Sequence, residues 1–265
     1  APVPFRNDCE MNNAMFVRIL FFTLALLAGS QTAQAELLFS APPRETAAAG
    51  EKIYGPLADL LSDVVGDVVR YEHPGDWPQY TKNMQEGRYD FVYDGPHFAA
   101  WRITNDGHTA LVRLPEHLRF YVVTLASDRE LPELKSLGEN AVCVMPAPNL
   151  TALVLGAELD SADVPAFHYV KGGNGALAKA LWANECRAAV LRDQFADRRL
   201  SFERRDSLRL LYRSDDYPNQ TITAGPRVPA ELHEPIIKAL TSRAGRQAGK
   251  GLLERFAGAG ASFLP

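Results

Sequence analysis

The sequence predicts an α/β protein in which short buried strands alternate with helices. Two observations indicate this class. Apolar runs of about four to six residues recur along the chain, and the segments between them carry apolar side chains at helical spacing. Hydrophobic residues make up 46% and charged residues 23% of the 265-residue chain, which is typical of a globular protein. The repeated strand–helix–strand order favours largely parallel sheets.

The first half of the chain contains three such strands, each followed by a helix. Between Leu57 and Val65 apolar residues recur at helical spacing, and Gly66 provides the stop. Gly87 ends a second helix in the same way, and Pro96 stands in the first turn of a third, where its missing N–H is harmless. The expected strands are 37–40, 68–72 and 89–93, and the helices include 57–65, 76–86 and 95–102.

A second α/β unit follows the first. Its expected elements are strands at 120–125, 141–145, 167–170 and 188–192, a short element ending at Gly138, and helices at 150–159 and 176–183. The run 208–212 is expected to return the chain to the first unit, with helices in 229–243 and 249–257 closing the fold. The predicted domains are therefore a lobe formed by 36–118 plus 206–265 and a second lobe formed by 119–205, joined by two crossings.

Residues 1–35 are expected to form a leader and a cleavable secretory signal. Arg18 precedes an apolar run at 19–27, and the small-residue ending 33–35 suits a signal peptidase. The run is shorter than the roughly 20 apolar residues of a membrane span. No cysteine follows the cleavage point, which argues against a lipoprotein. We therefore expect export to the periplasm.

Two cysteines, Cys143 and Cys186, remain after the leader. Both lie in or just before short strand patterns that can be neighbours in one parallel sheet. In an oxidising compartment they form either a disulfide or two buried thiols.

Composition and motifs exclude several classes of function. The net charge is −4, and its dispersed lysines and arginines form no basic patch for nucleic acid. The sequence contains no Gly-x-Ser-x-Gly, His-Glu-x-x-His, P-loop or dinucleotide motif. The six histidines show no i, i+4 pairing for a metal. These patterns therefore favour neither an enzyme nor a cofactor or metal site, and we expect none of them.

Several segments carry a resemblance to a known family. They are 54–62 followed by Gly66, 87–96, 134–138, 178–189, Ser214 with Pro218, and 249–256. They resemble the periplasmic substrate-binding proteins of phosphate, phosphite and phosphonate ABC importers. The resemblance implies a two-lobed clamshell of the type II periplasmic binding fold, which closes on a small anion and delivers it, as a monomer, to an ABC-type permease. A clamshell that signals to a membrane sensor is the alternative.

In the first lobe, four residues after predicted strands are candidate ligands for the anion. Arg44 suits bidentate contact with a phosphonate or carboxylate, or is a solvated loop residue. Tyr93, Asp94 and His97 stand together where a strand ends and a helix begins. Their alternatives are core packing for Tyr93, an N-cap for Asp94 and a surface position for His97.

In the second lobe, candidates follow three predicted strands. Asn149 and Thr151 open a helix whose amides suit oxyanions. Asn174 lies in a glycine-rich turn, and Arg192 and Asp193 end a strand. A turn without a ligand and a surface ion pair are the respective alternatives.

Overall fold

The computed structural model describes residues 36–159 and 165–265. The expected leader and signal, 1–35, lie outside these residues. Within the described ranges, no helix has the length and apolar character needed to cross a membrane.

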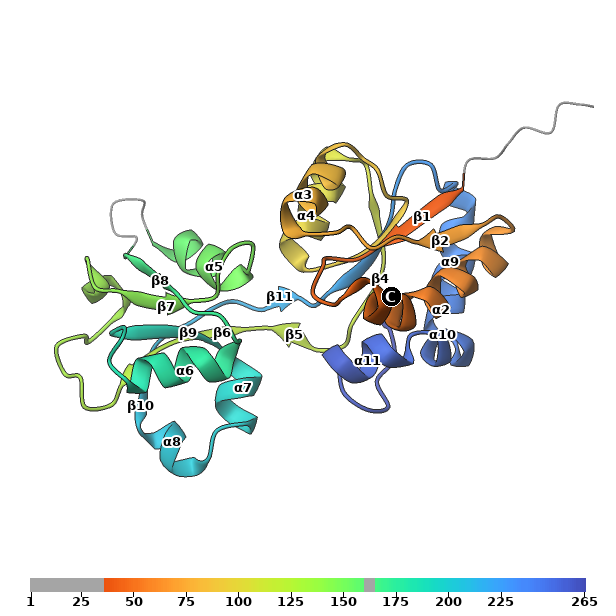
Figure 1. The fold of residues 1–265 in the computed structure, drawn as a ribbon. Coiled ribbons are helices and arrows are strands. Elements are labelled where there is room, and N and C mark those ends of the chain that lie inside the picture. Colours follow the sequence, from red (N-terminus) through yellow and green to blue (C-terminus); the bar gives the residue numbers. More distant parts are fainter. Residues whose placement is uncertain (1–35, 160–164) are drawn as a thin grey trace, which may run out of the picture. The chain divides into compact units, whose positions relative to one another are not determined.

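The first sheet has the strand order β2-β1-β3-β12-β4 (Figure 1). Strands β1 (Leu37–Ser40), β2 (Val69–Tyr71) and β3 (Phe91–Asp94) are parallel, whereas β12 (Thr221–Ala224) runs antiparallel to β3 and to β4 (Thr109–Arg113). Three helices follow β1, β2 and β3: α2 (Ala47–Val65), α3 (Trp77–Gln85) and α4 (Pro96–Asn105). The C-terminal helices are α9 (His233–Thr241), α10 (Arg243–Ala248) and α11 (Lys250–Phe256), preceded by the 3-10 turn η2 (Ala230–Leu232).

Local sequence signals explain where the helices of this lobe begin and end. The Thr46 hydroxyl accepts a hydrogen bond from the backbone N–H of Ala49 at the start of α2, and the Asp76 carboxylate does the same for α3. Gly66 ends α2 with a φ of 75°, a left-handed conformation that glycine adopts without strain.

Both faces of the first sheet are buried. Phe39, Phe91 and Tyr93 pack on the side of α2, α9 and α11, while Leu38 and Val92 pack on the side of α3 and α4. Figure 1 shows the helices α3 and α4 away from α2 and α9, across the sheet. Because successive side chains of a strand point to opposite faces, a strand covered on both faces has no polar side. This explains why β1 and β3 appear in the sequence as continuous apolar runs.

The second sheet has the order β10-β6-β9-β7-β8. Strands β7 (Val142–Val144), β8 (Phe167–Tyr169) and β9 (Ala188–Arg192) are parallel, and β6 (Phe120–Leu125) is antiparallel to β9 and to β10 (Leu208–Arg213). Helix α5 (Leu150–Glu158) packs on one face and α6 (Asn174–Trp182) on the other. The 3-10 turn η1 (Leu134–Leu137) and the short helices α7 (Asp193–Arg198) and α8 (Phe202–Asp206) complete the lobe.

A disulfide joins Cys143 on β7 to Cys186, just before β9. The two strands are neighbours and parallel, as the sequence allowed, and the two Cα atoms lie 5.7 Å apart. This separation falls within the range that a disulfide spans. Of the two alternatives left open, the structure therefore has the bridge and not a pair of thiols.

The expected two crossings are present, but the return crossing comes later than predicted. We expected 208–212 to rejoin the first lobe, whereas β10 pairs with β6 in the second sheet. The chain leaves the first sheet through β5 (His117–Leu118) and returns through β11 (Tyr217–Pro218), which pairs with β5 (Figure 1). Strand β10 covers the edge that β6 would otherwise expose. The two-lobed α/β architecture itself is confirmed.

Candidate functional site

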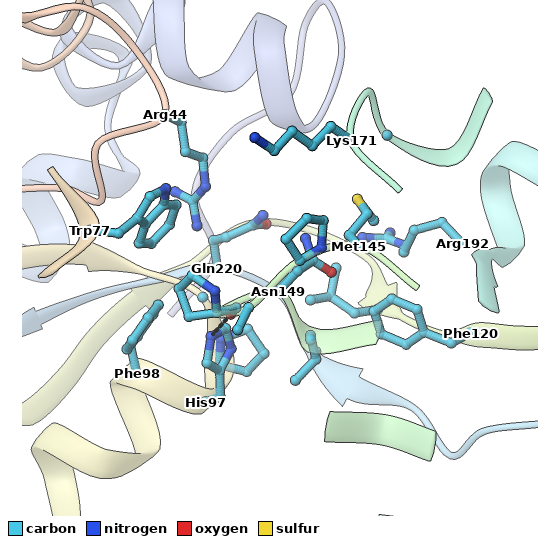
Figure 2. A pocket seen from close by; sticks show the side chains of 18 of the residues that line it. Arg44, Trp77, His97, Phe98, Phe120, Met145, Asn149, Lys171, Arg192 and Gln220 are labelled. Carbon is cyan, nitrogen blue, oxygen red and sulfur yellow. Dashed lines mark hydrogen bonds between the residues drawn. The ribbon is translucent and has the colours of Figure 1, made fainter. Parts of the chain in front are cut away.

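A cavity of about 580 Å³ lies where the loops of both lobes meet (Figure 2). Its wall is built mainly from the residues that follow β1, β2, β3, β7, β8 and β9. Ligand sites of α/β proteins lie beyond the carboxyl ends of parallel strands, because helix N-termini face that edge. The lining residues used below are Arg44, Trp77, Gly95, Pro96, His97, Phe98, Phe120, Met145, Asn149, Leu150, Lys171, Gly172, Gly173, Arg192 and Gln220.

The cavity is positively charged. Arg44, Lys171 and Arg192 line it, and Figure 2 shows their side chains entering from separate segments. Among the described residues that form its wall, none is an aspartate or a glutamate. Cations gathered without counter-charge repel one another unless an anion lies between them. The site is therefore suited to a negatively charged ligand.

Three helix N-termini add to this charge. The wall includes the start of α4 at Gly95 and His97, the start of α5 at Asn149, and the turn Gly172–Gly173 before α6. The first backbone N–H groups of a helix have no intrahelical partner, and together they carry about half a positive charge. Helix starts that face one cavity reinforce its preference for an anion.

Arg44 reaches the cavity from the loop between β1 and α2. Its neighbour Glu45 is ion-paired with Arg255 on α11, at 2.8 Å. The guanidinium of Arg44 lies 5.8 Å from the ring of Phe256, also on α11. Its Nη1 is buried and has no hydrogen-bond partner among residues 36–159 and 165–265. The loop is thus anchored by Glu45, and Arg44 lines the cavity with its Nη1 unpaired in the described structure.

His97 lies in the first turn of α4 and contacts the second lobe. Its Nε2 is 2.9 Å from the carbonyl oxygen of Pro148. Burial has the largest effect on the pKa of His97 and lowers it; Asp94 and the Pro148 carbonyl raise it by less, and Arg44 lowers it slightly. The ring is therefore neutral at physiological pH. Since a carbonyl can only accept, Nε2 carries the hydrogen and Nδ1 is an acceptor.

Arg192 ends β9 on the opposite side of the cavity. Its backbone N–H donates to Oδ1 of Asn174, at 2.8 Å. Its guanidinium lies 5.8 Å from the ring of Phe120, and its Nε is 3.8 Å from Oδ1 of Asp193. Burial lowers the pKa of Arg192, although an arginine stays charged in practice. In the part of the chain that the structure describes, the buried Nε makes no hydrogen bond.

Apolar side chains line the wall on two sides. The rings of Trp77 and Phe98 stack with centroids 6.2 Å apart on one side, and Phe120 and Met145 line the cavity on the other side (Figure 2). Aromatic rings provide large flat contact surfaces for the organic part of a ligand. The site thus combines a cationic region with an aromatic wall.

The family model described as "ABC transporter, phosphonate, periplasmic substrate-binding protein" matches residues 39–263. This chain belongs to that family. Among curated proteins, no sequence match was found.

Solved structures of periplasmic binding proteins and related proteins share the fold. XAC2383 from Xanthomonas citri bound to chloride ion superposes with a TM-score of 0.66 at 13% identity, covering 86% of this chain and 91% of that one. The same protein bound to ATP has a TM-score of 0.65 at 14% identity, covering 86% and 90%. PhnD1 from Prochlorococcus marinus in complex with methylphosphonate has a TM-score of 0.59 at 15% identity, covering 86% and 91%. At these identities the likeness concerns the fold.

Of the residues predicted as ligands of this binding protein, Arg44, His97, Asn149 and Arg192 line the cavity. Tyr93 and Asp94 do not, which corrects the expectation that they contact the ligand. Tyr93 has none of its surface exposed, and burial raises its pKa well above the ordinary value. Tyr93 therefore takes the alternative role in the core.

Asp94 takes neither of its expected roles. Its carboxylate is fully buried, 2.8 Å from Nε of Arg102, and it accepts a hydrogen bond from the hydroxyl of Tyr80. The N-cap of α4 is Gly95 and not Asp94. The paired carboxylate is thus a structural element beneath the site.

Three predicted residues of the second lobe support the cavity without lining it. The Thr151 hydroxyl accepts from the backbone N–H of Met145, at 3.0 Å, and its own backbone N–H donates to Oδ1 of Asn149. Asn174 binds the backbone of Arg192, and Asp193 lies 3.8 Å from Arg119. These contacts hold the loops of the cavity in place. Thr151, Asn174 and Asp193 themselves do not line the cavity, so the structure does not place them as ligands.

Several lining residues were missed from the sequence, among them Trp77, Lys171 and Gln220. A signal existed for two of them. Lys171 lies two residues beyond β8 and directly before Gly172, and Trp77 opens the helix that follows β2. Gln220 precedes β12, a strand that the sequence pattern did not indicate, and so had no recognisable position.

Within the described residues, no group of three or more histidine, cysteine, aspartate or glutamate side chains is arranged to hold a metal ion.

Proposed function

We propose that this periplasmic substrate-binding protein captures a phosphonate or a related oxyanion in the cavity between its lobes and delivers it to an ABC permease in the inner membrane. One observation carries the proposal: three cationic side chains and three helix N-termini face a cavity whose described lining residues include no carboxylate. The family supports delivery to a permease over signalling to a sensor.

The apolar wall favours an organic phosphonate over inorganic phosphate. A cavity of about 580 Å³ is in the size range of organic-ligand pockets, roughly 300 to 1,000 Å³, and far exceeds one phosphoryl group. Trp77 and Phe98 would contact the carbon substituent while the cations hold the head group. The neighbours bound to methylphosphonate and to ATP bind anions with such organic parts, which agrees with this assignment.

A thermal-shift panel on protein purified from the periplasm of a host that expresses the full chain tests the proposal. The ligands are phosphate, phosphite, methylphosphonate, phenylphosphonate, sulfate and acetate. A specific ligand at 100 times its Kd adds about 2.7 kcal/mol of stability. We expect phenylphosphonate to give the largest shift, and N-terminal sequencing to find a start near Glu36.

The matched variants are Arg44→Met, which removes a cavity cation, and Arg70→Met, which removes an exposed arginine of the same lobe. Arg44→Met should abolish most of the shift, and Arg70→Met should leave it unchanged. Absence of a shift with every anion, or equal shifts in the two variants, would contradict the proposal.

A further inference from the structure

Three residues of the first lobe converge at one point of the cavity wall. A Cβ atom built on Gly95 would lie 3.2 Å from Cε1 and 3.5 Å from Nδ1 of His97, and 3.8 Å from Nη2 of Arg44. The backbone φ of Gly95 is −68°, which any residue adopts. A side chain at this position would lie against the imidazole and the guanidinium, and the imidazole would have to shift by a few tenths of an ångström to accommodate it.

The two side chains at this point have opposite hydrogen-bonding character. The guanidinium of Arg44 can only donate. The Nδ1 of His97 can only accept while Nε2 donates to the Pro148 carbonyl. Over residues 36–159 and 165–265, both Nη1 of Arg44 and Nδ1 of His97 are buried without a hydrogen-bond partner. Buried polar atoms of this kind are costly unless something bonds to them, and the two residues that carry them both line the cavity.

We infer that the head group of the ligand presents an anionic oxygen to Arg44 and a hydroxyl to Nδ1 of His97, so that the site selects a singly protonated phosphonate over a sulfonate of the same shape. The inference rests on the proposed function and specifies its ligand. A phosphonate carries O⁻ and OH on one phosphorus atom, whereas a sulfonate has three acceptor oxygens and no proton. A sulfonate oxygen at Nδ1 would oppose two lone pairs.

Burial keeps the Nδ1 lone pair of His97 available, because it opposes a positive charge on the ring. Arg44 faces it from the loop after β1, and Asp94 lies beneath it on β3, where Arg102 already pairs with the carboxylate. From the second lobe the ring meets the Pro148 carbonyl, while Lys171 and Arg192 line the same cavity. Asp94 and the Pro148 carbonyl raise the pKa of His97 and Arg44 lowers it, but burial has the largest effect and lowers the pKa, so protonation of Nδ1 is opposed.

Isothermal titration with two matched pairs of probes tests the inference: methylphosphonate against methanesulfonate, and phenylphosphonate against benzenesulfonate. At about pH 8.5 the free phosphonates are mostly dianions, since a phosphoryl group has a second pKa of about 6 in phosphorylated side chains. Binding as the singly protonated form then takes up about one proton per ligand. The uptake is measured as the dependence of the binding heat on the ionisation enthalpy of the buffer. The sulfonates should bind at least tenfold more weakly and take up no proton.

Two variants separate the nitrogen atoms of the imidazole. His97→Gln places an amide donor near the position of Nε2 and removes the acceptor at Nδ1. His97→Asn places an amide oxygen near Nδ1 and removes the contact with Pro148. We expect His97→Gln to lose roughly 10- to 100-fold in phosphonate affinity, the loss of one buried hydrogen bond, together with the proton uptake. His97→Asn should retain the preference for phosphonate over sulfonate.

Each outcome bears on the inference. Equal affinity for phosphonates and sulfonates, or phosphonate binding without proton uptake, overturns the role of His97 and leaves the proposed anion-binding function standing. Binding of neither class overturns both. Retained discrimination in His97→Gln also overturns the inference, because the acceptor would lie elsewhere.

Discussion

Two arginines of the first lobe occupy opposite environments. Arg102 is fully buried, and its guanidinium pairs with Asp94 and lies over the ring of Tyr80. Arg44 is half-buried and lines the cavity. In the described structure each guanidinium has a buried Nη1 without a hydrogen-bond partner, but Arg102 pairs through its Nε with a buried carboxylate. The comparison indicates which charge serves the fold and which serves the ligand. A buried charge that pairs with another residue of the protein stabilises the fold. A charge that lines a cavity without such a counter-charge is available to a ligand.

Removing the partner of Arg102 should have the largest effect. Asp94→Asn leaves a guanidinium buried without a counter-charge, which costs about 3 to 5 kcal/mol in the free energy of unfolding. Urea unfolding followed by circular dichroism measures it. The double variant Asp94→Asn with Arg102→Met should recover much of the loss, because no buried charge then remains. If the single variant loses less than about 1 kcal/mol, the pair is not the structural element that its burial indicates.

The corresponding change at the cavity should affect binding and not stability. Arg44→Met is expected to lower the affinity for phenylphosphonate roughly 100-fold, since a charge-assisted hydrogen bond to a buried anion is lost. The free energy of unfolding of the empty protein should change by less than about 1 kcal/mol. Calorimetry and urea unfolding on the same preparation provide the two values. A loss of stability comparable with that of Asp94→Asn would refute the distinction between the two arginines.

A smaller effect on ligand affinity is expected from a change at Gly95, which lies against the side chains of His97 and Arg44. Gly95→Ala places a methyl group 3.2 Å from the His97 ring, so the ring must move by a few tenths of an ångström. The expected result is about a tenfold loss of phosphonate affinity with a nearly unchanged melting temperature. The control is Gly156→Ala on α5, where a Cβ meets no atom within 4 Å among the described residues. Equal affinities in the two variants would mean that Arg44 and His97 do not bind the same head group.

An exposed ion pair should give the smallest effect. Arg88 donates two hydrogen bonds of 2.8 Å to Glu72, and the hydrogen bonding lowers the pKa of the Glu72 carboxyl. Its stabilisation is therefore fully present above the ordinary glutamate pKa of about 4.3 and disappears as the pH falls through the lowered value. Arg88→Met should cost less than about 1 kcal/mol at neutral pH.

The pH dependence of that cost is the measurement. Urea unfolding of wild type and Arg88→Met at successive pH values should give stabilities that converge in acid. A difference that persists when Glu72 is protonated would show that the arginine stem, and not its charge, stabilises the sheet.

Much of the fold follows from patterns that are local in the sequence. Strands buried on both faces, such as β1, β3 and β9, are continuous apolar runs, and Gly66 marks a helix end through its own conformation. Strands β4 and β12 were missed because neither contains a continuous apolar run of four or more residues. They become strands through pairing: β12 pairs with β3, and β4 pairs with β12. The position of β10 in the second sheet likewise depended on tertiary pairing, because β10 joins that sheet at the free edge of β6.

The site, like the fold, was predicted only in part from the sequence. The sequence alone determined that Arg44, His97, Asn149 and Arg192 would stand at strand ends, where helix N-termini gather. Only the tertiary structure decided that the Asp94 carboxylate would pair with Arg102, eight residues away, and that Lys171 would line the cavity. The physical reason is that chain position fixes a residue at a strand end, whereas the availability of its charge depends on which partners the packing brings within hydrogen-bonding distance.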